Sequence, residues 1–225
     1  MLFLKDYFFA KDNSEFILTF YAHASVGIEW DGIHIYVDPV GEKYGVDYSL
    51  QPKADLVLVT HHHVDHFDAD TIKILSKEDT LVYASKKCSH DMTAACLAPY
   101  DSVIFKGISI MAVPAYNITK EHLQFHPKHD EGLGYVLNIG GTNLYIAGDT
   151  EDNDDVLSLQ DIDVAFLPVN QPYTMKIEQV INVARFIQPT ILYPYHTGSQ
   201  MGETVVTPLV DKLKGLCEVR IRNMI

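Results

Sequence analysis

Four histidines and an aspartate follow directly after a short apolar run, and this segment constrains the fold more than any other. Residues 54–60 read ADLVLVT, and the next six residues read HHHVDH. A continuous apolar run of this length indicates a strand buried on both faces. If the chain stays extended beyond the run, His61 and His63 point to one side and His62 to the other. Two imidazoles that converge at the end of a strand are typical of a site for zinc or a similar divalent cation.

Asp65 and His66 follow one turn later and can hold a second cation beside the first. The alternative is a polar loop that happens to contain four histidines. Such a loop would bring together groups that repel one another when they are protonated. The segment therefore predicts a metal centre at the end of a buried strand.

The rest of the chain predicts many strands, several of them in hairpins. Residues 16–22 and 33–38 are rich in β-branched and aromatic side chains, and an Asp-Gly turn precedes the second run. A Gly-Gly pair at 140–141 indicates a hairpin between two later strands. Further strands are expected at residues 102–105, 108–113, 134–139, 143–147, 164–169 and 190–195.

Three segments indicate helices. Residues 70–76 should form one, with Asp68 or Asp70 as its N-cap, and residues 176–187 carry apolar side chains at helical spacing. Thr207 followed by Pro208 resembles a helix start, and Gly215 would close that helix. Two sheets covered by outer helices would bury these elements. No linker or repeat divides the chain, so we expect one domain over residues 1–225.

Two residues near later strand ends complete the set of candidate ligands. Asp149 follows an apolar strand and a glycine, and a carboxylate at a strand end can bridge two cations and offset their repulsion. The alternative is that Asp149 caps the next segment. His196 follows the strand at 190–195 and is either a ligand or a hydrogen-bonded histidine at a strand end.

Several segments resemble signatures of the metallo-β-lactamase superfamily. Residues 61–66 resemble its HxHxDH motif, residues 148–150 its GDT motif, whose aspartate bridges two metals, and residues 195–197 its final histidine ligand. Residues 23–25 (HAS) and 37–39 (VDP) are most similar to the branch that contains L-ascorbate 6-phosphate lactonase and N-acyl phosphatidylethanolamine phospholipase D.

This resemblance implies an α+β, four-layer αβ/βα sandwich, in which two mixed β-sheets pack face to face and helices cover them. It also implies a binuclear centre of two divalent metal ions, zinc preferred, with manganese, iron or nickel as alternatives. The metal ligands that it implies are His61, His63, Asp65, His66, His126, Asp149 and His196.

One of these ligands has competitors. The family carries a further histidine between its first motif and the bridging aspartate, usually just after a strand. Asn117 occupies about that position here, and His122 and His126 follow it. We favour His126, because the neighbouring Phe125 and Pro127 would hold it rigidly, and place His122 second. If no histidine completes this site, one metal binds weakly and single occupancy follows.

Other residues are candidates for the pocket or for supporting the ligands. The resemblance places His23 near the active-site floor, although an ordinary buried histidine is an equal alternative. Asp38 could orient a ligand histidine through its second ring nitrogen, or simply form an Asp-Pro turn. Tyr116, Asn117 and Tyr173 are candidates for the pocket wall.

Composition narrows the function. The chain has 17 Lys and Arg against 30 Asp and Glu, a net charge of −13, and no basic run, which disfavours a nucleic-acid substrate. The three cysteines are sparse and show no CxxC spacing, which argues against a disulfide framework and favours a reducing compartment. With no signal-peptide pattern and no apolar stretch long enough to span a membrane, the sequence predicts a cytoplasmic protein. No feature specifies an oligomeric state.

The resulting hypothesis is a metal-dependent hydrolase. A metal-bound hydroxide would cleave an ester, lactone, amide or phosphodiester bond of a small molecule, with Asp65 as the catalytic side chain. The alternatives are a nuclease or phosphodiesterase on the same scaffold, and a non-catalytic metal-binding module.

Overall fold

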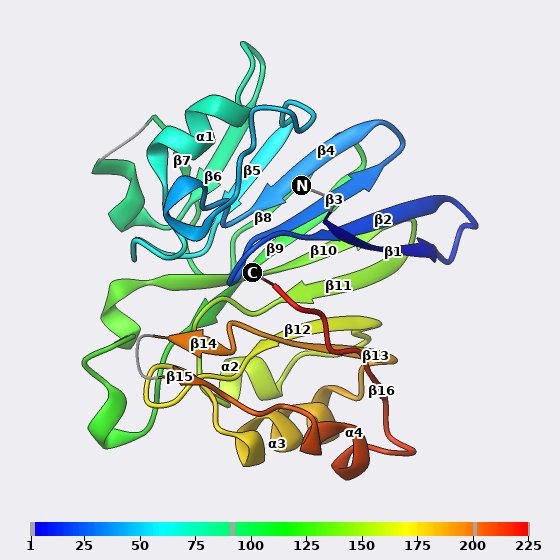
Figure 1. The fold of residues 1–225 in the computed structure, drawn as a ribbon, viewed down its shortest axis with the longest axis vertical. Coiled ribbons are helices and arrows are strands. Elements are labelled where there is room, and N and C mark those ends of the chain that lie inside the picture. The colour runs from blue at the N-terminus through cyan, green and yellow to red at the C-terminus, as the bar shows by residue number, and fades with distance from the viewer. Residues whose placement is uncertain (1–2, 91–92, 200–201, 225) are drawn as a thin grey trace. The chain divides into compact units, whose positions relative to one another are not determined.

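The computed structural model describes residues 3–90, 93–199 and 202–224. The chain forms two compact units, which we call the first unit (residues 1–98 and 223–225) and the second unit (residues 99–222). Each unit is built on one seven-stranded mixed sheet, whose strands are labelled in Figure 1.

In the first unit, strand order follows the sequence from β1 to β7. Strands β1 to β4 are antiparallel, and β4 to β7 are parallel. The turn between β3 and β4 is Asp31–Gly32, and both residues have the positive φ that a two-residue type I′ hairpin requires. The strands are β1 (Leu4–Phe9), β2 (Glu15–Phe20), β3 (Val26–Trp30), β4 (Ile33–Val37), β5 (Leu56–Val59), β6 (Leu81–Ala84) and β7 (Ala95–Cys96).

The apolar run before the histidines forms β5, as expected. All four of its residues are buried, and the strand pairs in parallel with β4 on one side and β6 on the other. Helix α1 (Ala69–Leu75) follows the histidine turn, and Asp68 caps it by accepting a hydrogen bond from the backbone N–H of Thr71. The helix packs Ile72 and Leu75 into the core of this unit.

In the second unit the strand order is β16-β13-β12-β11-β10-β9-β8. Strands β8 to β11 are antiparallel, and β11, β12, β13 and β16 are parallel. The strands are β8 (Ser102–Phe105), β9 (Ile108–Ala115), β10 (Gly132–Ile139), β11 (Thr142–Ile146), β12 (Val164–Pro168), β13 (Ile191–Tyr195) and β16 (Glu218–Val219), and β14 (Gly198–Ser199) with β15 (Gly202–Glu203) forms a separate ribbon.

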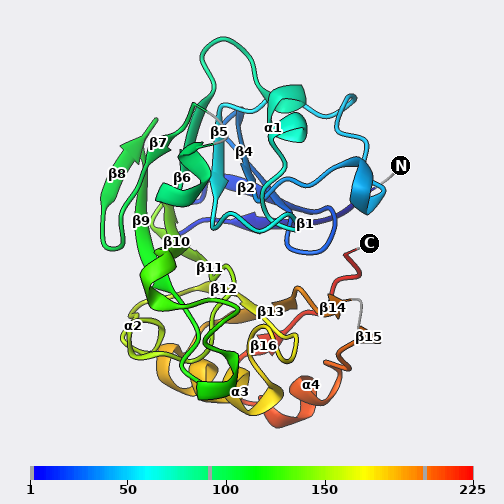
Figure 2. The same ribbon diagram turned by 90° about the vertical axis from the view of Figure 1, so that its left-hand side faces the viewer.

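Among its described residues, this unit has three helices: α2 (Asp154–Leu157), α3 (Ile177–Ile187) and α4 (Pro208–Lys212). Figures 1 and 2 show α3 and α4 together on one face of the sheet. The apolar face of α3 packs Val180, Val183 and Ala184 into a core shared with β11, β12 and β13. Short 3₁₀ turns occur at Glu42–Tyr44, Lys86–His90, Lys120–His122 and Lys128–Asp130.

One expected helix differs in its ends. Helix α4 stops at Lys212, and Gly215 lies beyond it with a φ of 84°. Thr207 precedes the helix, but it already has helical φ and ψ, so its side chain makes no capping hydrogen bond. None of the helices among the described residues combines the length and hydropathy needed to cross a bilayer.

Candidate metal centre

The turn after β5 gathers the histidines of the first motif. It is closed by backbone hydrogen bonds from His66 and Phe67 to the carbonyl of His63, at 2.9 and 2.8 Å. Nε2 of His61 and Nδ1 of His63 are 3.1 Å apart, and His61 is buried. Two ligands of a tetrahedral zinc ion, with bonds of about 2.0 Å, are separated by about 3.3 Å. The spacing of these two nitrogens therefore suits one shared cation.

Asp38 connects the ends of two neighbouring strands through a buried network. It follows β4, and its carboxylate accepts hydrogen bonds from the backbone N–H and the hydroxyl of Thr60, at 2.7 and 2.6 Å. It also accepts from Nδ1 of His66 at 2.7 Å. A carboxylate only accepts, so Nδ1 of His66 carries a proton, and in the neutral ring Nε2 retains its lone pair. This is the arrangement that prepares a histidine for a metal.

His23 and Asp65 form a second pair in the same unit. Nε2 of His23 lies 3.2 Å from Oδ2 of Asp65, and the aspartate side chain is 28% exposed. Ligand atoms of His23, Asp65 and His66 all lie within 4.8 Å of one another. Burial and the negative charge of Asp65 raise the pKa of Tyr44, whose ring stacks on His23, to about 12. We call His61, His63, Asp65 and His66 the first-unit cluster.

In the second unit, parallel strands deliver polar side chains to one edge of the sheet. The segments after β11, β12 and β13 carry Asp149, Asn170 and His196 respectively. The long connection after β9, residues 116–131, carries His126; we call it the histidine loop. Carboxyl ends of parallel strands meet at the same edge, which explains why residues far apart in sequence converge here.

Asp149 lies between two histidines. Its Oδ2 atom is 3.3 Å from Nε2 of His126 and 3.3 Å from Nε2 of His196. All three side chains are buried. Nδ1 of His126 donates to the carbonyl of Tyr173 at 3.0 Å, and Nδ1 of His196 lies 3.4 Å from the amide of Asn170. We call His126, Asp149 and His196 the second-unit cluster. Its donor set and spacing fit a divalent cation of the zinc type.

The competitors of His126 have other partners. Nδ1 of His122 is 3.1 Å from Oε1 of Glu151, and the Asn117 amide donates to the carbonyls of His122 and Tyr173, at 3.2 and 2.7 Å. Among the three candidates, the ion pairs of the described residues place His126 at Asp149.

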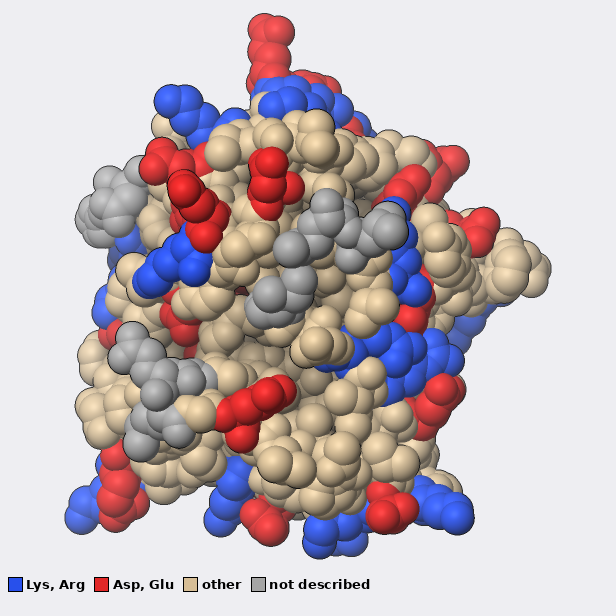
Figure 3. Space-filling model, viewed as in Figure 1, with Lys and Arg blue, Asp and Glu red and all other residues tan. Residues whose placement is uncertain are grey.

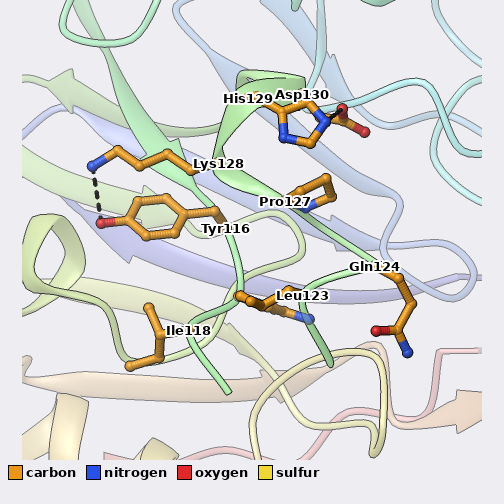
Figure 4. A pocket seen from close by; sticks show the side chains of 9 residues that line it. Tyr116, Ile118, Leu123, Gln124, Pro127, Lys128, His129 and Asp130 are labelled. Carbon is orange, nitrogen blue, oxygen red and sulfur yellow. Dashed lines mark hydrogen bonds and ion pairs between the residues drawn. The ribbon is translucent and has the colours of Figure 1, made fainter. Parts of the chain in front are cut away.

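The two tyrosines expected in the pocket wall have different places. Tyr116 lines an open groove of about 960 Å³ on the histidine loop, together with Ile118, Leu123, Pro127 and Lys128. Figure 4 shows Lys128 lying across the ring of Tyr116, with its Nζ 3.2 Å from the phenol oxygen. Tyr173 is half-buried and packs its ring on Phe125, while its carbonyl holds His126 and Asn117.

Sequence reasoning missed three polar residues that support these clusters: Thr60, Asn170 and Glu151. Glu151 is completely buried. Burial raises the pKa of its carboxyl, but backbone N–H groups of Thr119 and Ile118 and the His122 ring outweigh burial, and the pKa lies below its ordinary value. Its position two residues after Asp149 was the sequence feature that could have indicated its place beside the metal ligands.

Three residues around the clusters have a left-handed backbone. The φ angles of His23, Asp38 and His196 are 54°, 45° and 51°. Such angles are uncommon for residues with a side chain, although Asp and His tolerate them better than most. Asp38 and His196 directly follow β4 and β13, and His23 lies in the connection between β2 and β3.

The surface agrees with the acidic composition. On the face shown in Figure 3, Lys and Arg are interspersed with Asp and Glu, and the largest basic group, at the right-hand side, has acidic side chains directly beside it. A groove for a nucleic-acid backbone would require an extended basic patch.

Comparisons with known proteins identify the family. The model of the Beta-lactamase superfamily domain matches residues 17–196. A UPF0173 metal-dependent hydrolase from Flavobacterium johnsoniae is 32% identical over 80% of this chain and 83% of its own length, and one from Thermococcus kodakarensis is 30% identical over 79% and 82%.

Solved structures agree. A protein from Parabacteroides distasonis, described as a metal-dependent hydrolase, is 41% identical with a TM-score of 0.93 and full coverage of both chains. A protein from Thermotoga maritima, described as a Zn-dependent hydrolase of the metallo-β-lactamase superfamily, has 17% identity and a TM-score of 0.63. The match covers 92% of this chain and 97% of that one, and the likeness concerns the fold alone.

These likenesses confirm the superfamily and the fold class expected from the sequence, while the finer branch stays a prediction. The chain therefore belongs to the metallo-β-lactamase superfamily and is an enzyme, a metal-dependent hydrolase.

Proposed function

We propose that this enzyme hydrolyses an ester, lactone, amide or phosphodiester bond of a small molecule with two divalent cations, zinc preferred. The first-unit and second-unit clusters would supply the ligands, and the two units would act as one domain. The family match supports this, because residues 17–196 include both clusters.

The observation that carries the proposal is the state of the ring nitrogens. Nδ1 of His66 is engaged by Asp38, and Nδ1 of His126 by the Tyr173 carbonyl. In both rings Nε2 therefore retains its lone pair in the neutral tautomer, which is the form that binds a metal. Nε2 of His126 also lies 3.3 Å from Oδ2 of Asp149, so these two atoms could bind the same cation.

The metal supplies the nucleophile when it is bound, because it lowers the pKa of a coordinated water from about 15.7 to about 7. The side chains of this protein orient the reaction. Asp65 is partly exposed and lies 3.2 Å from the His23 ring, so its carboxylate can take a proton from the attacking water and be held in place by that ring. Asp149 can neutralise charge between the ligand histidines.

A small-molecule substrate is preferred over a nucleic acid because of the net charge of −13 and the interspersed charges on the surface in Figure 3. The three cysteines are sparse and lack a CxxC spacing, which supports a reducing compartment and thus a cytoplasmic enzyme.

The test combines metal content with activity. Purified protein should contain close to two equivalents of metal by plasma mass spectrometry, and it should hydrolyse some member of a panel of esters, lactones, amides and bis-p-nitrophenyl phosphate. Chelation should abolish the activity, and zinc or manganese should restore it. Protein that takes up no metal, or turnover that survives complete chelation, would overturn the proposal.

A further inference from the structure

The histidine loop raises the question of what fixes His126. The loop spans residues 116–131 and contains only two single-turn 3₁₀ segments, Lys120–His122 and Lys128–Asp130. A connection of this length has little structure of its own to hold a side chain in place. The position of His126 must therefore come from contacts that the loop makes with other segments.

A backbone hydrogen bond closes the first half of the loop. The N–H of Asn117 donates to the carbonyl of His126 at 2.8 Å, so residues 117–126 form a closed turn. The Asn117 side chain and the His126 ring then share one acceptor, the carbonyl of Tyr173. These hydrogen bonds fix the two ends of the turn, Asn117 and His126, but not the residues between them.

The buried carboxylate of Glu151 contacts three groups of the closed turn. Its Oε2 atom accepts hydrogen bonds from the backbone N–H groups of Ile118 and Thr119, at 2.7 and 2.6 Å. Its Oε1 atom is 3.1 Å from Nδ1 of His122. All three partners lie between Asn117 and His126, so a single side chain holds the residues between the two ends of the turn.

The same segment also carries a ligand. Glu151 is two residues from Asp149, and the N–H of Glu151 donates to the carbonyl of Tyr116 at 3.2 Å. The hydroxyl of Thr150 and the amide of Asn153 bond to that same carbonyl, at 3.1 and 3.0 Å. The chain on which Asp149 lies is thus joined at several points to the loop on which His126 lies.

We propose that Glu151 is a positioning residue of the metal centre, which holds the histidine loop so that Nε2 of His126 stays at Asp149. This role rests on the proposed function, because it concerns a ligand of the metal. Groups that orient metal ligands from behind typically change metal affinity by about 10- to 100-fold when they are removed.

The experiment compares Glu151→Ala and Glu151→Gln with the wild type. The control is Glu121→Gln, the same chemical change on an exposed carboxyl of the same loop. Metal affinity is measured by competition with a chromophoric chelator, and hydrogen exchange of residues 117–126 is followed by mass spectrometry in the chelated protein.

Glu151→Ala should weaken binding of one metal equivalent by about 10- to 100-fold and expose the amides of Ile118 and Thr119 to exchange. Glu151→Gln should keep most of the metal affinity and most of the protection from exchange, since its amide oxygen can still accept hydrogen bonds from the two N–H groups. The control should match the wild type. A purely structural role would lower the thermal midpoint without a selective loss of one metal.

Thr119→Pro keeps the proposal testable if Glu151→Ala fails to fold. It removes the backbone N–H and the hydroxyl that Thr119 offers to Glu151, at a residue whose φ of −67° suits proline, and it leaves the carboxylate intact. This variant should also bind one of the two metal equivalents more weakly than the wild type does. Wild-type affinity in either Glu151→Ala or Thr119→Pro would overturn the positioning role alone, whereas a wild-type protein without metal would overturn the proposed function as well.

Discussion

The carboxylate of Asp38 and the imidazole of His66 form a buried hydrogen-bonded pair at 2.7 Å, with side chains 1% and 0% exposed. Asp38 follows β4 and His66 lies in the turn after β5, so two adjacent parallel strands bring the pair together. The pair determines which nitrogen of His66 is free to bind a cation.

Replacing Asp38 with Asn should weaken metal binding by about 10- to 100-fold. An amide nitrogen in place of Oδ2 would turn Nδ1 of His66 into an acceptor and move the proton to Nε2, which could then not bind a metal. Metal competition assays measure the effect, with Asp79→Asn, at a 70% exposed side chain, as the control. Equal affinities in the two variants would show that Asp38 does not set the tautomer.

Metal removal should lower stability as well as abolish activity. A ligand present at 100 times its Kd stabilises a protein by about 2.7 kcal/mol, which corresponds to a thermal midpoint shift of about 5–10 °C in a chain of this length. Differential scanning fluorimetry with and without chelator measures the shift.

His126→Ala should lose much of this metal-dependent shift, because the variant lacks a ligand of the second-unit cluster. His129→Ala is the matched control, since that side chain is 83% exposed on the same loop. A shift that is kept in His126→Ala but lost in His122→Ala would make His122 the ligand.

Asp155 should contribute a pH-dependent part of the stability. It accepts hydrogen bonds from the hydroxyls of Tyr100 and Tyr116 and from Lys128, at 2.6, 2.9 and 3.3 Å. Burial raises the pKa of its carboxyl, but these bonds outweigh burial and hold the pKa below its ordinary value of 3.8. Since the folded pKa is lowered, the stabilisation is complete well above pH 3.8 and is lost as the pH falls through the folded value.

The contribution of Asp155 to stability is measured by urea unfolding of the chelated wild type and of Asp155→Asn at several pH values. The difference in unfolding free energy should be constant from about pH 7 to about pH 5 and shrink below about pH 4. A difference that grows as the pH falls would mean that folding raises this pKa.

Gly134→Ala should destabilise the second unit by about 1–3 kcal/mol. A Cβ atom at Gly134 would lie 2.6 Å from the carbonyl oxygen of Ala147 and 2.9 Å from that of Ile146, and neither backbone can yield easily. Gly198→Ala is the control, because a Cβ there meets nothing within 4 Å. Urea unfolding checks both, and a fully stable Gly134→Ala protein would contradict the expected clash.

The strands and the long helix could be predicted because local patterns specify them. The apolar run of β5, the Asp31–Gly32 turn and the apolar spacing of α3 each depend on neighbouring residues alone. Short elements such as β16 could not be read in this way, because its two residues become a strand only by pairing with β13. The end of α4 at Lys212 likewise departs from the glycine signal at Gly215.

The site was partly predictable for a similar reason. Strand-end positions indicated His61 in the first unit and Asp149 and His196 in the second, since the parallel strands of each sheet gather their ends at one edge of that sheet. The role of Glu151 was hidden, because its partners are backbone N–H groups of a loop more than thirty residues earlier. Nothing in the identities of Ile118 and Thr119 indicates that their amides need an acceptor.

The left-handed backbone of His23, Asp38 and His196 has an evolutionary consequence. Glycine would adopt each of these conformations without the cost of about 1 kcal/mol that a side chain incurs there. Each side chain offsets this cost through a contact that glycine could not make: His23 with Asp65, Asp38 with Thr60 and His66, and His196 with Asp149. Libraries evolved for thermal resistance and libraries evolved for turnover should therefore both retain these three side chains.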